Sequence, residues 1–217
     1  GSIRAAAPLE SRLLLNANID RALRDNENAE AYFAAALRDL RELRMAGTRE
    51  TLFGLEGAYA GRQVDWRDWD RHLARIEAAG FKFVLELVPE YFVRNDDDFG
   101  PKWEANLQAW VYDVVSHYGT RPLWYSLHNE PDFRAKGTWW SQAENLVHLQ
   151  RLAWEALKRA NPQAKLETSP LGTPAGNNVA ARDLFELGIT RYCDYYGFHA
   201  HFATDDLPAR SQVFQVW

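Results

Sequence analysis

The sequence predicts a (β/α)8 TIM barrel in the α/β class, of which about six β/α units are present. Short apolar segments typical of buried strands alternate with longer segments whose apolar residues recur at helical spacing. The Gly-x-Gly-x-x-Gly turn of nucleotide-binding folds is absent. One apolar segment, 123–128, runs directly into Asn129-Glu130-Pro131, which places a carboxylic acid at the end of a strand, where TIM barrels keep their chemistry.

The expected elements follow one another in regular order. We expect strands at 13–15, 50–56, 81–88, 123–128, 164–169 and 195–199, and helices at 29–45, 65–79, 103–115, 139–160 and 179–187. Glycines are expected to end three of the helices, at Gly47, Gly80 and Gly188, and Asn161-Pro162 ends the fourth. The nearly continuous apolar run 81–88 is typical of a parallel strand covered on both faces.

The length and composition favour one domain over residues 1–217. The chain has 217 residues, of which 47% are hydrophobic and 13% aromatic, so it can bury a large core. TIM barrels typically take about 250 residues, and six open strands would expose two sheet edges. We therefore expect an incomplete barrel, from a shortened or processed chain or one that a second chain or segment completes.

Charge and cysteine content bound the partners. The net charge of -5 and the scattered Lys and Arg residues leave no basic stripe for nucleic acid. No apolar run could span a bilayer, so we expect no membrane partner. The single Cys193 excludes an internal disulfide and is expected to be a small buried side chain. Gly1-Ser2 is typical of a cloning scar that could replace a signal peptide, so localisation is undetermined, with a secreted or periplasmic one slightly favoured.

Glu130 is the candidate general acid. Pro131 has no amide N–H and biases Glu130 away from the right-handed α region, so the strand stops and the acid stays at its rim. Aromatic residues nearby can supply the dry surroundings that keep such an acid protonated. They are Trp124, Tyr125, His128, Trp139 and Trp140. Taken alone, Asn-Glu-Pro is also ordinary turn chemistry.

The order of several motifs resembles the clan A glycoside hydrolases, and most closely family 39, the group of β-xylosidases, α-iduronidases and bacterial exopolysaccharide hydrolases. The resemblance covers roughly Asp65 to Phe202. The motifs are Trp66-Arg-Asp-Trp-Asp70, Ala78-Ala-Gly80, Phe83-Val-Leu-Glu-Leu87, His117-Tyr-Gly-Thr-Arg-Pro122 and Asn129-Glu-Pro-Asp132.

The resemblance implies a retaining glycosidase that acts on an oligo- or polysaccharide and needs no organic cofactor. It implies that Glu130 is the acid/base and that Asn129 contacts the sugar 2-hydroxyl. His199 fits the family's His-x-Tyr pattern at the end of strand six, whereas His201 stands in place of the tyrosine that usually touches the nucleophile. We expect both histidines, with His128, to lie in the sugar site.

The clan's nucleophile lies at the end of strand seven, and no segment of this sequence is recognised as that strand. Four other glutamates sit on or just beyond strands, namely Glu56, Glu86, Glu90 and Glu167. None matches the nucleophile position. For each we expect an ion pair, a polar contact inside the barrel or a charge at its rim.

Other interpretations of the same residues stay open. The chain could be a non-catalytic or truncated saccharide-binding barrel, in which nothing performs substitution. His128, His199 and His201 could instead ligate zinc in a metal-dependent hydrolase, although no acid or cysteine stands at ligand spacing. Trp139 and Trp140 could stack on sugar rings, but one of them is expected to pack under the fourth helix. The run Asn95-Asp-Asp-Asp98 could bind calcium, but a solvated loop is the expected interpretation.

Overall fold

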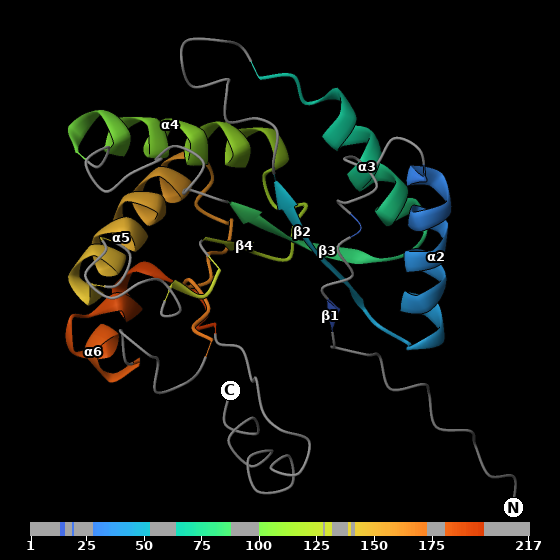
Figure 1. Cartoon of the computed structure of the whole chain (residues 1–217). Helices are drawn as coiled ribbons and strands as arrows, with labels where there is room; N and C mark the ends of the chain where they lie inside the picture. Colours follow the sequence, from blue (N-terminus) through green and yellow to red (C-terminus); the bar gives the residue numbers. More distant parts are fainter. Residues whose placement is uncertain are drawn as a thin grey trace, which may run out of the picture.

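The computed structural model has a parallel sheet with helices between its strands (Figure 1). The structure describes residues 14–15, 19, 28–52, 64–87, 100–127, 129–131, 139, 142–172 and 181–197. The elements are β1 (Leu14–Leu15), α2 (Ala29–Glu42), β2 (Gly47–Leu52), α3 (Arg67–Ala78), β3 (Lys82–Leu87), α4 (Pro101–Tyr118), β4 (Tyr125–Ser126), α5 (Ala143–Ala160), α6 (Ala181–Glu186) and the 3-10 helix η6 (Ile189–Tyr192).

The strand order matches a barrel wall. The four strands pair in the order β1-β2-β3-β4, and every pair is parallel. Two further parallel bridges continue the wall, from Tyr125 to Leu166 and from Glu167 to Tyr195. The six expected parallel segments are therefore adjacent in chain order, although the last two pair only through single bridges.

The two faces of the strands have different roles. On β2, Thr48 donates a hydrogen bond of 2.9 Å to Glu50, whose other oxygen lies 2.7 Å from Nε2 of His72 in α3. This face therefore meets the helices, and the residues in register with it on β3 are buried apolar ones such as Leu85. Because side chains alternate along a strand, Arg49 and its neighbours two residues away face the barrel interior.

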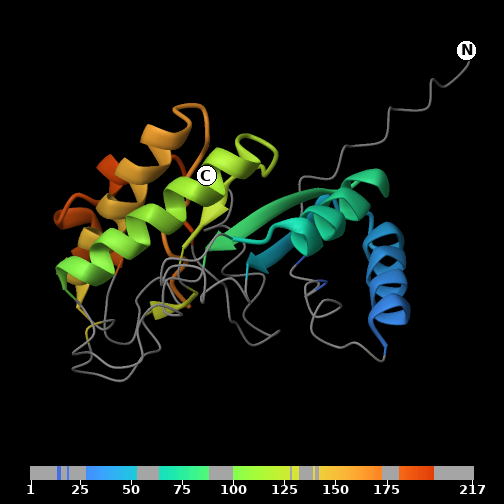
Figure 2. The ribbon, with the colours of Figure 1, turned by 90° about the horizontal axis from the view of Figure 1, so that it is seen from above.

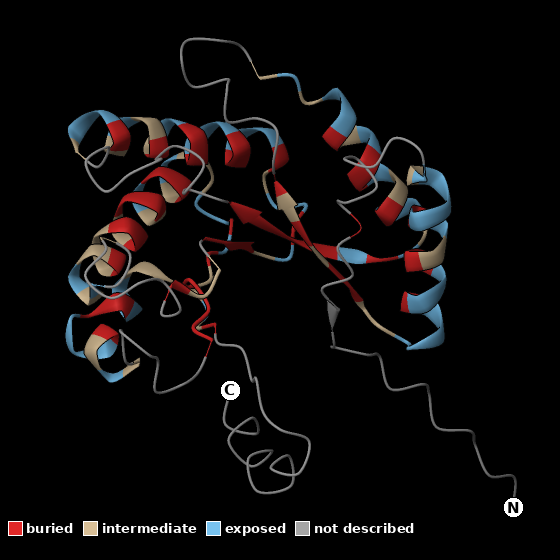
Figure 3. Ribbon diagram, viewed as in Figure 1, coloured by how far each residue is buried: buried red, intermediate tan, exposed pale blue. Residues whose placement is uncertain are grey.

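The helices bury one stripe each against the outer face of this wall (Figure 3). On α2 the buried residues recur at helical spacing, as Phe33, Ala36, Leu37 and Leu40. Helices α4 and α5 lie side by side next to β4, whereas α2 and α3 lie beside β2 and β3 (Figure 2). The packed core therefore lies between the sheet and the helices, as in TIM barrels.

The expected end of the first helix is wrong. The helix ends at Glu42, and Arg44 adopts the left-handed conformation with φ 53° after it. Gly47 does not cap the helix but begins β2, so this strand starts three residues earlier than the expected 50–56 and includes Arg49. By contrast, Gly80 and Gly188 follow their helices with φ of 88° and 82°, as expected of glycine caps.

Other boundaries also moved. The fourth expected helix begins at Ala143 and not at Trp139, and the 3-10 helix η6 was not predicted. Cys193 is half-buried, and burial raises the pKa of its thiol. No helix in the described part of the chain is long and apolar enough to cross a membrane.

Candidate functional site at the carboxyl ends of the strands

Glu130 lies just beyond β4, where the fourth strand leaves the sheet. Its backbone N–H donates a hydrogen bond of 3.0 Å to the carbonyl oxygen of Pro170, which follows the fifth strand segment. Pro131 is buried, and Asn129 and Glu130 are half-buried. The acid is therefore fixed to the ends of two neighbouring strands, at the edge where the sequence predicted it.

The backbone of Glu130 is strained. Its φ is 50°, in the left-handed region, whereas a residue before proline usually adopts an extended conformation. A non-glycine residue held in this region costs about 1–3 kcal/mol, and such residues cluster at functional sites. The proline does keep Glu130 out of the right-handed α region, as expected, but the chain turns more sharply than an extended residue would allow.

Arg49 connects three strands at this edge. Its Nη1 donates a hydrogen bond of 2.9 Å to Oδ1 of Asn129, and its Nη2 lies 3.0 Å from Oε1 of Glu86 on β3. Thr51 donates a hydrogen bond of 2.7 Å to the other oxygen of Glu86. Because the Asn129 oxygen accepts from Arg49, the amide NH2 group is the part that can donate to a ligand.

Sequence reasoning missed Arg49 because it placed the second strand after this residue. The available signal was Arg49 in alternation with Thr51, on the strand face opposite Thr48 and Glu50. A buried arginine requires a partner, which points to a carboxylate on the neighbouring strand. In the structure its side chain is 13% exposed and that of Glu86 is 8% exposed.

Two of the four other glutamates lie in the described region, and both have the expected kind of contact. Glu86 forms the ion pair with Arg49. Glu167 accepts a hydrogen bond of 3.1 Å from Nε1 of Trp124 inside the barrel wall. A Cβ atom at Gly197 would lie 2.6 Å from the Glu167 carboxylate, so a larger residue there would displace this side chain. Glu56 and Glu90 lie outside the described residues.

The aromatic surroundings differ from the expectation. Tyr125 does not line the rim: its side chain faces the helices, its hydroxyl donates to the Gly119 carbonyl, and burial raises its pKa. Trp124 faces the interior, where its ring centroid lies 5.4 Å from that of Tyr195. Tyr125 was assigned to the wrong face because neighbouring residues on a strand point in opposite directions.

Trp139 packs against a helix, but its ring contact is with α4 and not with α5, the fourth expected helix. Its ring lies edge-on to Trp103 of α4, with 5.3 Å between ring centroids, and it is half-buried. Its carbonyl oxygen accepts a hydrogen bond from Asn145 at the start of α5. The remaining predicted site residues, His128, Trp140, His199 and His201, lie outside the described residues, as does the acidic run 95–98.

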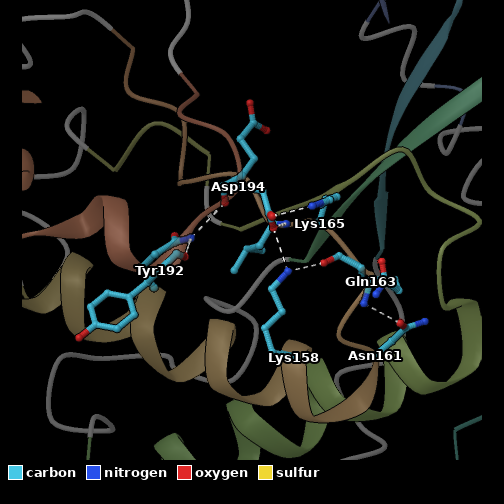
Figure 4. A network of polar contacts seen from close by, with 10 residues as sticks. Lys158, Asn161, Gln163, Lys165, Tyr192 and Asp194 are labelled. Carbon is cyan, nitrogen blue, oxygen red and sulfur yellow. Dashed lines mark hydrogen bonds and ion pairs between the residues drawn. The ribbon is translucent and has the colours of Figure 1, made fainter.

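Asp194 fixes the sixth strand segment beside the fifth (Figure 4). It accepts hydrogen bonds from the Leu166 N–H at 3.0 Å, Lys165 at 3.0 Å and Lys158 at 3.1 Å. Burial alone would raise the pKa of Asp194, but these bonds and the positive charge of Lys158 outweigh it and lower the pKa. The cluster lies at the edge opposite Glu130 and has a structural role.

No group of three His, Cys, Asp or Glu side chains suited to a metal ion occurs among the residues that the structure describes. The described part of the site therefore consists of Glu130, Asn129 and the Arg49–Glu86 pair. It presents one carboxyl group, one amide donor and a buried ion pair at the rim of a parallel sheet. Such a group can exchange a proton with a ligand that the amide orients.

No protein-family model and no curated protein matches the sequence. Solved structures do match. A family 39 glycoside hydrolase from Bacteroides cellulosilyticus WH2 is similar at 18% identity with a TM-score of 0.58, over 75% of this chain and 34% of that one. A glucosidase from Croceicoccus marinus is similar at 13% identity with the same TM-score, over 75% of this chain and 39% of that one.

A family 10 endoxylanase from a sugarcane soil metagenome is similar at 10% identity with a TM-score of 0.58, over 94% of this chain and 63% of that one. The chain spans between a third and two fifths of the length of the first two structures. These neighbours are TIM-barrel glycoside hydrolases from different families of clan A, so they do not single out family 39. The chain has the fold of part of such a barrel.

Proposed function

We propose that the chain forms part of the catalytic barrel of a retaining clan A glycoside hydrolase, most like family 39, with Glu130 as its general acid/base. The observation that carries the proposal is the placement of Asn129-Glu130-Pro131. It lies at the carboxyl end of β4, tied to Arg49 of β2 and to Pro170 after the fifth strand segment. This is the edge where TIM barrels carry out their chemistry.

The proposed reaction has two steps. In the first, the protonated Glu130 gives its proton to the glycosidic oxygen while a second carboxylate attacks the anomeric carbon and the leaving group departs. In the second, the Glu130 carboxylate takes a proton from water, which displaces the enzyme carboxylate from the sugar. Asn129, held through its oxygen by Arg49, donates its amide hydrogen to the sugar 2-hydroxyl.

The nucleophile in this proposal belongs to a seventh strand or to a partner segment. Glu86 is engaged by Arg49 and Thr51, and Glu167 accepts from Trp124, so each has a role within the wall. A retaining pair needs carboxyl groups about 5–5.5 Å apart. We therefore assign neither Glu86 nor Glu167 to attack on the sugar.

A saccharide-binding barrel without turnover is the second candidate. It is favoured by the engagement of both other described interior glutamates within the wall. In that case Asn129 and Glu130 would hydrogen-bond the sugar without splitting the glycosidic bond. The two candidates differ in turnover of aryl glycosides, while both predict binding of saccharides.

Chemical rescue tests the role of Glu130. The parent, Glu130→Ala and the control Glu155→Ala, which changes an exposed residue of α5, would be assayed on a panel of dinitrophenyl glycosides with and without azide. Dinitrophenolate leaves without receiving a proton, and azide attacks without the help of a general base. Azide should therefore increase the turnover of Glu130→Ala but not that of the parent or of Glu155→Ala. The product should be a glycosyl azide of retained configuration.

Two other results would contradict the proposal. Unchanged turnover by Glu130→Ala would refute its assignment as acid/base. A parent chain that binds saccharides in calorimetry but releases no dinitrophenolate, even when the segment that supplies the nucleophile is present, would favour the binding barrel.

A further inference from the structure

The edge of the barrel opposite Glu130 carries one basic side chain at each passage from a helix into the next strand. These residues are Arg44 before β2, Lys82 at the start of β3, Arg121 before β4, Lys165 before the fifth segment and Arg191 before the sixth. All five are exposed. We call this set the basic edge. The carboxyl ends of α4 and α5, which lead into two of these passages, are uppermost in Figure 2.

Negative charge compensates the basic edge in part. Glu42 and Glu186 end α2 and α6 next to Leu43 and Leu187, although each also lies within 4 Å of an arginine of its own helix. Arg121 pairs with Glu77 at 2.9 Å and Lys165 with Asp194 at 3.0 Å. Arg44, Lys82 and Arg191 form no ion pair with any residue that the structure describes. This distribution contrasts with the whole chain, in which 30 Asp and Glu outnumber 25 Lys and Arg.

Exposed leucines lie between these charges. Leu43 is 55% exposed, Leu123 39% and Leu187 40%, whereas every other leucine whose burial the structure describes is buried. Each lies in one of the same passages, next to α2, β4 and α6 respectively. Basic side chains near the carboxyl ends of helices complement the helix dipole, but that effect gives no reason for leucines there.

We propose that the basic edge and its three leucines bind the surface of a bilayer that contains anionic lipid. Basic side chains are attracted to anionic headgroups, and exposed apolar side chains enter the boundary between headgroups and acyl chains. The contact is peripheral and needs no spanning helix, so it departs from the expectation of no membrane partner, which depended only on the lack of a spanning apolar run. The edge that carries Asn129 and Glu130 then faces away from the bilayer.

Sedimentation with vesicles tests this proposal without any assay of turnover. The full chain would be mixed with vesicles of phosphatidylcholine alone or with one third phosphatidylglycerol. The charge variant is Arg44→Glu/Lys82→Glu/Arg191→Glu. Its matched control, Arg38→Glu/Arg71→Glu/Arg182→Glu, makes the same charge change on the outer faces of α2, α3 and α6, where these arginines are 64%, 71% and 79% exposed. The apolar variant is Leu43→Ser/Leu123→Ser/Leu187→Ser.

The parent and the control should bind the anionic vesicles and not the neutral ones. The charge variant should bind about 100-fold more weakly or worse, as expected when three basic contacts are lost. The apolar variant should also lose binding, although its charge is unchanged. Circular dichroism would verify that each variant is folded.

Three results would overturn the proposal. The first is no sedimentation of the parent with anionic vesicles. The second is an equal loss in the control, which would indicate a general charge effect. The third is a pair of observations: the apolar variant binds anionic vesicles as strongly as the parent does, and the parent binds soluble dextran sulfate as strongly as it binds these vesicles. That result would assign the basic edge to a polyanion and not to a bilayer.

Discussion

Arg49 and Asn129 are 80 positions apart in the chain, yet their side chains are joined by a hydrogen bond of 2.9 Å. The same guanidinium lies 3.0 Å from Glu86, so one side chain holds the end of β4 against β2 and β3. Since Glu130 follows Asn129 directly, the ion pair also fixes the acid in the proposed mechanism. This relationship gives the first two predictions.

Arg49→Lys should lower kcat/KM about 100-fold, because a displacement of roughly 1 Å at a reacting group can cost this much. Lysine keeps the charge beside Glu86 but cannot hold Glu86 and Asn129 together through a planar fork. Steady-state kinetics on an aryl glycoside would measure the change. The control Arg38→Lys alters an exposed arginine of α2. An unchanged kcat/KM in Arg49→Lys would refute a positioning role.

Glu86→Gln should reduce the free energy of unfolding by about 3 kcal/mol, since it leaves the Arg49 charge buried without its carboxylate. The matched control is Glu42→Gln, which removes an exposed carboxylate 3.9 Å from Arg38. That control should change stability by less than about 1 kcal/mol. Urea unfolding compares them, and equal effects would contradict the importance of the Arg49–Glu86 pair.

Asp194 should make the free energy of unfolding depend on pH in the acidic range. Folding lowers its pKa from 3.8, so the unfolded chain binds more protons there and stability increases with pH. The contribution is complete well above pH 3.8 and is lost as the pH falls through the lowered pKa of the folded state. The difference in unfolding free energy between the parent and Asp194→Asn should therefore shrink on acidification. Urea titrations from about pH 6 to about pH 3 would show this, and a constant difference would contradict it.

Gly47→Ala should prevent folding or destabilise the chain by more than about 4 kcal/mol. The new Cβ atom would lie 2.0 Å from the carbonyl oxygen of Lys82, where β2 and β3 pair. Gly80→Ala is the matched control, because no heavy atom lies within 4 Å there and only its φ of +88° is unfavourable. It should cost about 1 kcal/mol. Equal effects on the melting temperature would contradict a close approach at Gly47.

Much of the wall was predictable because its signals are local. The apolar run that became β3 and the stripe that became α4 are set by periodicity within each segment. Gly80 was recognised because a glycine after the last inward residue is a common helix cap. The same rule gave a wrong helix end at Gly47. Arg44 adopts the left-handed conformation after the helix, whereas Gly47 leaves room for the backbone of Lys82 on β3, which is distant in sequence.

Contacts within the site were harder to predict. Glu130 was identified because Pro131 marks the end of its strand. Arg49 was missed since its role depends on Glu86 and Asn129, which reach it only through the register of three strands. A shift of one residue along a strand moves its side chains to the other face of the sheet. The periodicity of a strand as short as β4 does not fix this position, so the sequence did not determine the face on which Tyr125 lies.

The most direct test of the account is the dependence of turnover on the leaving group. Glu130→Ala and the parent would be compared on aryl glycosides whose phenols range from acidic to weakly acidic. If Glu130 donates the proton, bond cleavage should be slowed about 100- to 10,000-fold for weakly acidic phenols and little changed for dinitrophenol. Cleavage measured as the initial burst of phenol should therefore depend steeply on phenol acidity in the variant only. A loss of equal size across the whole series would contradict the assignment of Glu130 as the acid.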